Sequence, residues 1–253
     1  MDKLWSLMPT AFVWHFLYHT ELRSVFGERL FDARAVAVAL LVTLWGARLT
    51  WQFARRGGYS TMAYEDYRWA TLRADMASIP GLYPAFNLLV VSIGFPLLLL
   101  AIALPAYFAW DRAGSARSWL DWVAGAAALA ALTLEARADA EQNAFQARRR
   151  ARGPPRKRSM GAAATGRSSE AVQGFVQSGL WAWSRHPNYF AEQLFWWALY
   201  LFAVAASGRW INWAAAGPLG LSLMFHGSVN LTERIAAKKY ARSVGERGQA
   251  GEQ

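Results

Sequence analysis

The sequence predicts an all-α protein, a polytopic integral membrane bundle of about six transmembrane helices. Hydrophobic residues make up 55% of the 253 residues and charged residues only 17%, below the roughly 25% of soluble domains. Several apolar stretches approach or exceed the ~20 residues that cross a bilayer. Basic residues gather between these stretches, as they do in the cytoplasmic loops of membrane proteins.

Five apolar stretches are long enough, or nearly long enough, to span the membrane. The clearest covers residues 85–110 and contains no charged residue. A shorter sixth stretch covers residues 4–18. Proline and glycine inside the stretches, at Pro96, Pro105 and 217–218, predict kinks. The remaining stretches carry at most one charge each: 35–53 with Arg48, 119–134 with Asp121, 189–206 with Glu192, and 210–231 with none.

A basic run predicts the orientation of the bundle. Seven of the eleven residues in 148–158 are basic, and they lie between two apolar stretches. The positive-inside rule places this run in the cytoplasm, together with both chain termini. It also explains the net charge of +10 without a nucleic-acid partner. The membrane would be the endoplasmic reticulum of a eukaryote or the inner membrane of a bacterium.

The chain is expected to form one domain. Residues 1–240 would make a single membrane-embedded unit, interrupted by a flexible basic loop at 147–170. The last residues, 241–253, are expected to form a disordered tail. Membrane lipids are its expected surroundings.

The segment GLWAWSRHPNYFAEQ, residues 179–193, is the first candidate site. Pro187 suits the first turn of a helix, whose free N–H groups would point back toward Arg185. Such a helix start beside an arginine suits an anion such as phosphate. Asn188 and Tyr189 add hydrogen-bonding groups, and Glu192 lies one turn further into the apolar stretch. The alternative is an interfacial anchor, which is the preferred interpretation for the nearby Trp181 and Trp183.

A second group of polar residues lies at the ends of the other predicted spans. Glu135, Asp139 and Gln142 share one helical face where a span leaves the membrane. Arg48 either joins a site or extends to the interface, and Glu233 follows the last span. For each of these residues, simple solvation remains the alternative. The cluster YEDYRW at 64–69 is expected to brace its loop through Asp66 and Arg68.

Several classes of site are excluded or weakened. The chain has no cysteine, so disulfides, thiolate catalysis and cysteine-ligated zinc are excluded. Its four histidines complete no metal-ligand spacing, so no metal site is expected. It contains neither GxGxxG nor a Walker loop, which gives no support for a Rossmann domain or a P-loop NTPase.

Four strings occur together in one order: LWGARLTWQFARRGGY…EDYRW, E-x3-D-x2-Q-x2-FQ, SRHPNYFxEQ and GS-x4-E. Taken together, they resemble the steroid 5-alpha-reductase-like membrane proteins, in the branch with the SRHPNY signature. The resemblance covers about residues 4–240. It implies a helical membrane reductase that holds NADPH in a cytoplasm-facing cavity. Hydride would pass to an activated carbon–carbon double bond of a lipophilic substrate that enters from the bilayer.

The resemblance also implies roles for individual residues. Tyr189, His186 and Glu192 are the candidate catalytic residues, because the reaction needs a proton donor. One departure concerns Trp45, which stands where the steroid-reducing members have a tyrosine. A steroid ketone therefore loses one expected contact. The matched cofactor-binding positions are Arg185, His186, Asn188, Tyr189, Asp139, Arg48, Glu135, Gln142 and Glu233.

Two other functions remain open. The pattern RHP-x-Y beside a basic loop, followed by an acid after the last span, is similar to isoprenylcysteine carboxyl methyltransferases. That likeness implies S-adenosylmethionine as the cofactor and a lipid or isoprenylated substrate. The third hypothesis is a membrane scaffold without turnover. Whether a cofactor binds at all distinguishes the scaffold from the two enzymes.

Overall fold

The computed structural model describes residues 3–25, 32–61, 65–112, 115–151 and 175–249. Within these ranges every regular element is helical, which confirms the all-α prediction. The α-helices are α1 (Leu7–Val25), α2 (Ala33–Arg55), α3 (Tyr67–Asp75), α4 (Leu82–Phe86), α5 (Phe95–Ile102), α6 (Leu104–Asp111), α7 (Trp119–Ala151), α9 (Pro187–Ser207) and α10 (Ala216–Gln249). The other elements are the π-helix η1 (Asn87–Gly94) and the 3₁₀ turns η2 (Gly179–Ala182) and η3 (Trp213–Ala215).

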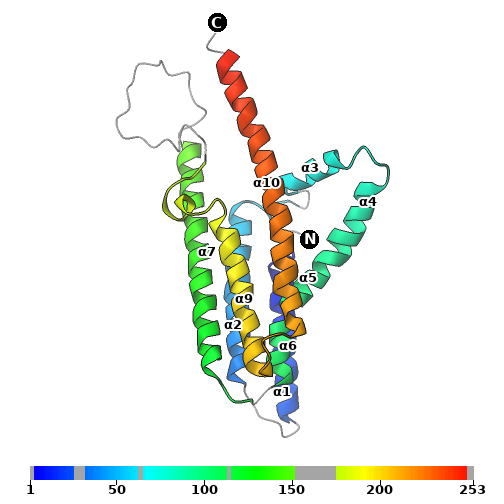
Figure 1. The fold of residues 1–253 in the computed structure, drawn as a ribbon, viewed down its shortest axis with the longest axis vertical. Helices are drawn as coiled ribbons and strands as arrows, with labels where there is room; N and C mark the ends of the chain where they lie inside the picture. Colours follow the sequence, from blue (N-terminus) through cyan, green and yellow to red (C-terminus); the bar gives the residue numbers. More distant parts are fainter. Residues whose placement is uncertain (1–2, 26–31, 62–64, 113–114, 152–174, 250–253) are drawn as a thin grey trace.

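The long helices form an elongated bundle in which the chain direction alternates (Figure 1). α1, the α4–α6 segment and α9 run one way, whereas α2, α7 and α10 run the other way. α2 and α7 therefore end, and α9 begins, at the same end of the bundle, where α3 also lies. We call this the polar end, and the end where α7 begins the far end.

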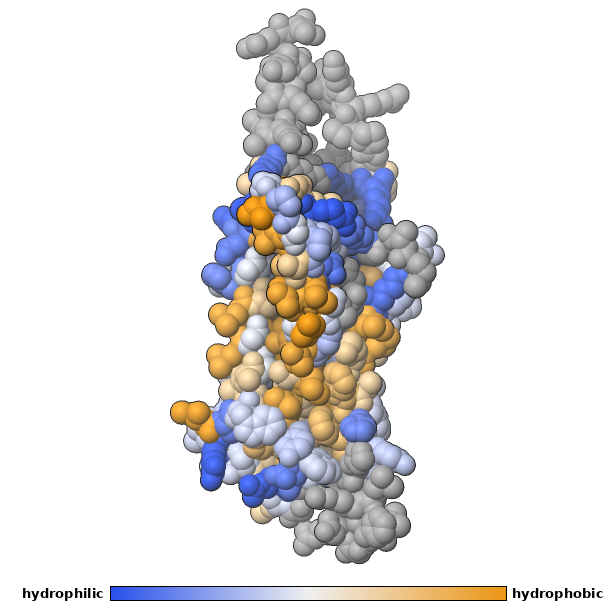
Figure 2. Space-filling view, turned by 90° about the vertical axis from the view of Figure 1, so that its right-hand side faces the viewer, coloured by the Kyte–Doolittle hydropathy of each residue, from blue (hydrophilic) through white to orange (hydrophobic). Residues whose placement is uncertain are grey.

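Four helical segments are long and apolar enough to cross a membrane: Ala33–Arg55, Leu82–Ile102, Trp119–Ala151 and Pro187–Ser207. They coincide with four of the predicted spans. α1 and α10 lie alongside them but are not among the four, so six crossings remain a prediction. Figure 2 shows hydrophobic side chains over the middle of one face and hydrophilic ones toward its two ends. This distribution is what a bilayer requires.

The segment predicted as one span at 85–110 is divided by its prolines. Pro96 has no N–H to donate to the fourth residue before it, and the preceding turns form η1. The Phe95 N–H accordingly bonds to Val90 O, five residues back. A second break follows at Ala103, and Pro105 lies in the first turn of α6. Two of the three predicted kinks, at Pro96 and Pro105, coincide with these breaks, whereas 217–218 lie at the start of α10.

The core joins α2 to α9 through aromatic rings. Trp45 is fully buried and stacks on Phe195 at a centroid distance of 6.3 Å. It also meets Trp196 edge-to-face at 4.9 Å. α7 packs along α9 with fully buried alanines, including Ala124 and Ala128. Small residues let two helix backbones approach closely where lipid gives no hydrophobic drive for packing.

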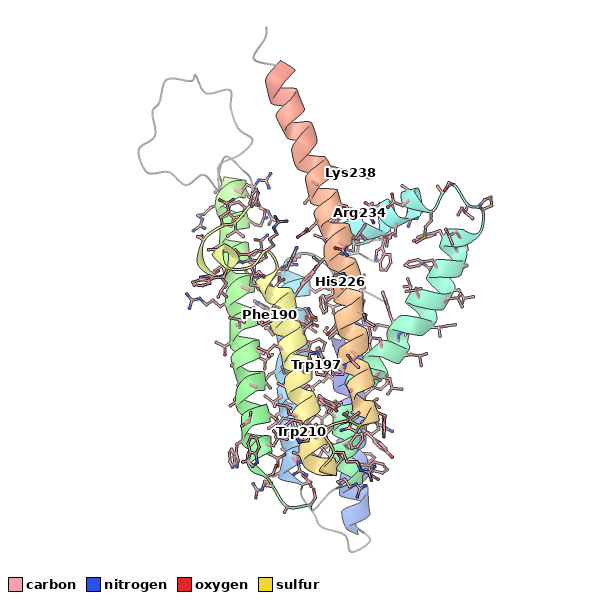
Figure 3. All side chains as sticks on the ribbon, viewed as in Figure 1. Phe190, Trp197, Trp210, His226, Arg234 and Lys238 are labelled. Carbon is pink, nitrogen blue, oxygen red and sulfur yellow. The ribbon has the colours of Figure 1, made fainter. Side chains whose placement is uncertain are left out.

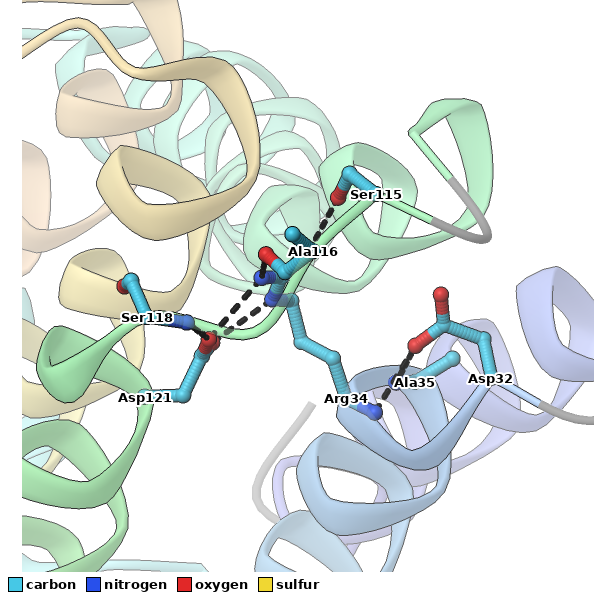
Figure 4. Close-up of polar contacts among 7 residues, drawn as sticks. All are labelled: Asp32, Arg34, Ala35, Ser115, Ala116, Ser118 and Asp121. Atoms are coloured by element: carbon cyan, nitrogen blue, oxygen red, sulfur yellow. Dashed lines mark hydrogen bonds and ion pairs between the residues drawn. The ribbon is translucent and has the colours of Figure 1, made fainter.

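At the far end, Arg34 and Asp121 form a buried ion pair (Figure 4). Arg34 Nε lies 2.6 Å from Asp121 Oδ1, and Arg34 Nη1 donates to Ser115 at 2.6 Å. Asp32 caps the start of α2 by accepting from the Arg34 backbone N–H. The one charge of the predicted span at 119–134 is therefore neutralised by α2. Its role is structural.

Three boundaries differ from the sequence-based prediction. The last predicted span, 210–231, becomes helical as η3 and α10 only from Trp213 onward. α10 continues to Gln249, so residues 241–249 are helical where a disordered tail was expected. Extending an existing helix gains one hydrogen bond per residue, without a new nucleation cost. Residues 147–151 of the expected loop belong to α7, whereas 152–170 lie outside the described ranges.

Candidate functional site

The start of α9 has the geometry that its proline predicts. His186 is the N-cap residue, and Pro187 occupies the first turn. The first turn of α9 therefore points its free backbone N–H groups and its positive dipole end toward the polar end. Arg185, directly before the cap, has a side chain that is 80% exposed.

The segment before α9 is fastened to α7. Glu141 Oε2 accepts from the Leu180 backbone N–H at 2.9 Å. The Trp181 indole N–H donates to Ala138 O at 3.1 Å. Trp181 therefore binds α7, whereas Trp183 is 92% exposed. These contacts fix the position of the segment that leads from η2 to Arg185 and His186.

Glu233 of α10 meets the start of α9. Its Oε1 lies 3.4 Å from Arg185 Nη1 and 3.6 Å from His186 Nε2. The His186 and Tyr189 rings stack with a centroid distance of 5.3 Å and an angle of 20°. Tyr189 also packs on Phe225 of α10 at 4.8 Å. The fold thus brings Glu233, which the sequence placed only after the last span, to three residues of the 179–193 segment. We call Arg185, His186, Tyr189 and Glu233 the vestibule.

A hollow of about 490 Å³ opens beside the vestibule, between the start of α9 and α10. Figure 3 shows Arg234 and Lys238 on the part of α10 that extends past the start of α9. Asn230 and Arg234 were not predicted as site residues, although positions 230, 233, 234 and 237 follow the helical period. The hollow is lined by Arg185, Asn230, Glu233, Arg234 and Ala237.

The surroundings of His186 in the vestibule change its pKa. Burial lowers the pKa of His186, and the nearby Arg185 acts in the same direction. The Glu233 carboxylate opposes both by favouring the charged imidazolium. The net direction is downward from 6.5, so the imidazole is mainly neutral at neutral pH.

Arg68 connects the loop at α3 to the vestibule. Asp66 caps α3 by accepting from the Arg68 backbone N–H at 2.9 Å, and it pairs with Arg68 Nε at 2.8 Å. The predicted bracing of this loop is confirmed. Arg68 Nη1 also donates to Ser228 of α10 at 2.7 Å, and its charge lies near Tyr189. The sequence did not indicate this second contact, because Arg68 and Ser228 are 160 positions apart.

A second group, deeper in the bundle, joins α2, α7 and α9. Arg48 Nη1 lies 2.5 Å from Asp139 Oδ2, and Nη2 bonds Glu135 Oε1. The Glu192 carboxyl of α9 lies beside Glu135 and the Trp196 indole. The predicted polar face of α7 is confirmed, and Arg48 points to it. We call Arg48, Glu135, Asp139 and Glu192 the buried cluster.

Several buried polar atoms of the described residues have no hydrogen-bond partner. In native proteins such atoms are uncommon and often mark functional positions. Most of them lie in or near the buried cluster or in the first turn of α9, and others, such as Ser118 Oγ and Thr232 Oγ1, lie elsewhere. The unpartnered atoms include Arg48 Nε, Glu135 Oε2, Glu192 Oε1, Gln142 Oε1, Asn188 Oδ1 and Trp45 Nε1.

No group of three or more His, Asp or Glu side chains in the described ranges could hold a metal ion.

Comparisons with known proteins place the chain in a family. The family model described as "Protein of unknown function (DUF1295)" matches residues 1–246. The chain belongs to the DUF1295 family. An uncharacterised protein of Schizosaccharomyces pombe is 38% identical over 251 residues, which cover 95% of this chain and 67% of that protein. No solved structure matches this DUF1295 protein.

Proposed function

We propose that this DUF1295 protein is a membrane-bound, NADPH-dependent reductase of a carbon–carbon double bond in a lipophilic enone or sterol-like substrate. The observation that carries the proposal is the convergence of Arg185, His186, Tyr189 and Glu233 beside one hollow at the polar end. The hollow's size lies within the range of small-molecule and cofactor sites. The association of DUF1295 with steroid 5-alpha-reductase-like proteins supports the same reaction.

The residues present fit NADPH. Arg185 and Arg234 line the hollow and would bind its phosphates, since guanidinium groups match phosphate oxygens. Glu233 would accept hydrogen bonds from ribose hydroxyls. Asn188 Oδ1, buried without a partner, would accept from the nicotinamide carboxamide.

NADPH would supply the hydride, and the protein must supply a proton and stabilise the developing charge. Tyr189, His186 and Glu192 are the proposed catalytic residues. A mainly neutral His186 has little proton to give, which favours the other two. Trp45 is fully buried against aromatic rings, so it would not bind a substrate carbonyl in place of the tyrosine of steroid-reducing members.

Three members of the buried cluster, all except Glu192, would act from behind the cofactor site. Arg48 is engaged by Glu135 and Asp139, so these three would shape the site rather than contact the cofactor freely. Gln142, with its unpaired Oε1, lies one turn nearer the polar end and would reach the cofactor more directly. The lipophilic substrate would arrive from the bilayer, whether in the endoplasmic reticulum or a bacterial inner membrane.

A thermal-shift titration of the detergent-purified protein tests this proposal. NADPH, NADH and S-adenosylmethionine are compared at about 100 times their dissociation constants, where a ligand specific for the folded state stabilises by ~2.7 kcal/mol. Stabilisation by NADPH supports the reductase. Stabilisation by S-adenosylmethionine alone would replace it with a lipid methyltransferase. No shift with any ligand would favour a scaffold without turnover.

A further inference from the structure

We propose that Glu135 and Glu192 form a carboxyl pair that holds one proton at neutral pH and donates it to the substrate. The donor role rests on the proposed reductase function, whereas the held proton does not. The pair is formed by neighbouring helices, α7 and α9, inside the bundle.

The charges of the buried cluster do not balance. Glu135, Asp139 and Glu192 are 3%, 5% and 7% exposed, and the guanidinium of Arg48 is the cation that interacts with them. Both of its ion pairs go to α7, to Glu135 and Asp139. Glu192 thus enters the cluster from α9 without an ion-pair partner among the residues that the structure describes. A buried carboxyl group in this situation takes up a proton, because isolated charge is too costly away from water.

The position of Glu192 determines where that proton sits. Its carboxyl lies next to the Glu135 carboxyl, and among the described residues Glu192 Oε1 and Glu135 Oε2 are both buried without a hydrogen-bond partner. Two carboxyl groups share a hydrogen bond only when one of them is protonated, since ionised carboxylates only accept. Trp196, one turn further along α9, also contacts Glu192 and is fully buried.

The same position suits proton donation. Glu192 is four residues after Asn188 on one face of α9, and it lies three residues after Tyr189. In the proposed reaction, hydride from NADPH would add to the β-carbon of the enone, and the double-bond electrons would move toward the carbonyl oxygen to give an enolate. The proton leaves the carboxyl pair and bonds to the α-carbon. The pair becomes fully ionised beside Arg48 and regains a proton from water, so the sum is enone plus NADPH plus H⁺ giving ketone plus NADP⁺.

Infrared spectroscopy of the purified full-length protein at pH 7 tests the held proton directly. A protonated carboxyl has a C=O stretch that is distinct from carboxylate and amide bands and shifts in D₂O. We expect this band in the parent, and we expect it to move when glutamate alone is labelled with ¹³C. The label assigns the band to glutamate without any substitution. A parent spectrum without the band, or a band that moves only with labelled aspartate, would overturn the proposal.

Substitutions then assign the band to the pair. Glu192→Gln and Glu135→Gln should each remove it, whereas the matched control Glu65→Gln should keep it, because Glu65 is exposed and ion-paired with Arg73. Glutamine mimics a neutral glutamate, so Glu192→Gln should keep the parent's unfolding temperature. If Glu192→Gln folds and retains the band, the pair does not hold the proton.

The donor role has a separate readout. In Glu192→Gln, the NADPH-induced thermal shift should persist while NADPH oxidation with a steroid 4-en-3-one falls at least tenfold. If NADPH never binds but the band is present, the reductase fails and the held proton stands. Full oxidation activity in Glu192→Gln would overturn the donor role.

Discussion

Arg48 of α2 and Asp139 of α7 are 91 positions apart in the chain, and their Nη1 and Oδ2 atoms lie 2.5 Å apart. One turn further on, Asn143 donates to Gln52 at 2.9 Å, again across 91 positions. The equal separation means that the two helices run parallel and in register through this region. The ion pair and the amide pair together hold α2 against α7 below the vestibule.

Removing Arg48 should destabilise the protein strongly. Arg48→Met leaves Glu135 and Asp139 as uncompensated buried charges, which costs about 3–5 kcal/mol in comparable cases. Thermal unfolding in detergent measures the loss. The double variant Arg48→Met/Asp139→Asn should recover part of it, because one of the stranded charges is then absent. Equal stability of Arg48→Met and the parent would show that the pair contributes nothing to folding.

Arg185→Ala should weaken NADPH binding without destabilising the protein. The side chain is 80% exposed, and its Nη1 lies 3.4 Å from Oε1 of Glu233, which is itself 41% exposed. Its loss therefore leaves no buried group unpaired. A lost charge-assisted contact to phosphate corresponds to roughly ten- to a hundredfold in affinity. Isothermal titration with NADPH gives the result. Arg112→Ala is the matched control, since Arg112 is also exposed and ion-paired, and unchanged binding in Arg185→Ala would exclude a phosphate contact.

His186 should make stability depend on pH. Burial lowers its pKa in the folded protein, so the unfolded chain binds a proton first as pH falls through 6.5. The free energy of unfolding should therefore decrease on acidification in this range. Unfolding temperatures between about pH 5 and 8 should show a shallower fall in His186→Asn. Glu233→Gln removes the charge that favours the imidazolium, so the fall in unfolding temperature should become steeper. Identical pH profiles in the parent and both variants would contradict the role of His186.

Gly217 allows α10 to approach α5. A Cβ there would overlap Ala101 O and lie 2.7 Å from Ile102 Cα. Gly217→Ala should force the helices apart and cost about 1–3 kcal/mol, measured as a lower unfolding temperature. Gly227→Ala on the same helix is the control, because nothing lies within 4 Å of its added Cβ. That variant should gain up to ~1 kcal/mol from helix propensity.

Local chemistry made much of this predictable. Pro187 indicated the start of α9, Pro105 the break before α6, and the 3.6-residue period put Glu135 and Asp139 on one face. The extension of α10 to Gln249 was not predicted. Residues 241–249 combine low hydropathy with many charged side chains, and this composition suggests disorder whether or not a helix continues through it. The hydrogen bond of the Trp181 indole to α7 was not predicted either, because the amphipathic character of a ring does not identify its hydrogen-bond partner.

The sequence by itself determined that this is an all-helical chain with segments long and apolar enough to cross a membrane, and it indicated the polar residues at their ends. Hydropathy and periodicity are local properties and suffice for that. Only the tertiary structure decided which of these residues meet. It joined Glu233 to Arg185, Arg68 to Ser228, and Glu192 to the Arg48 cluster. Such pairings depend on helix direction, register and rotation, which packing sets across separations of tens to more than a hundred residues.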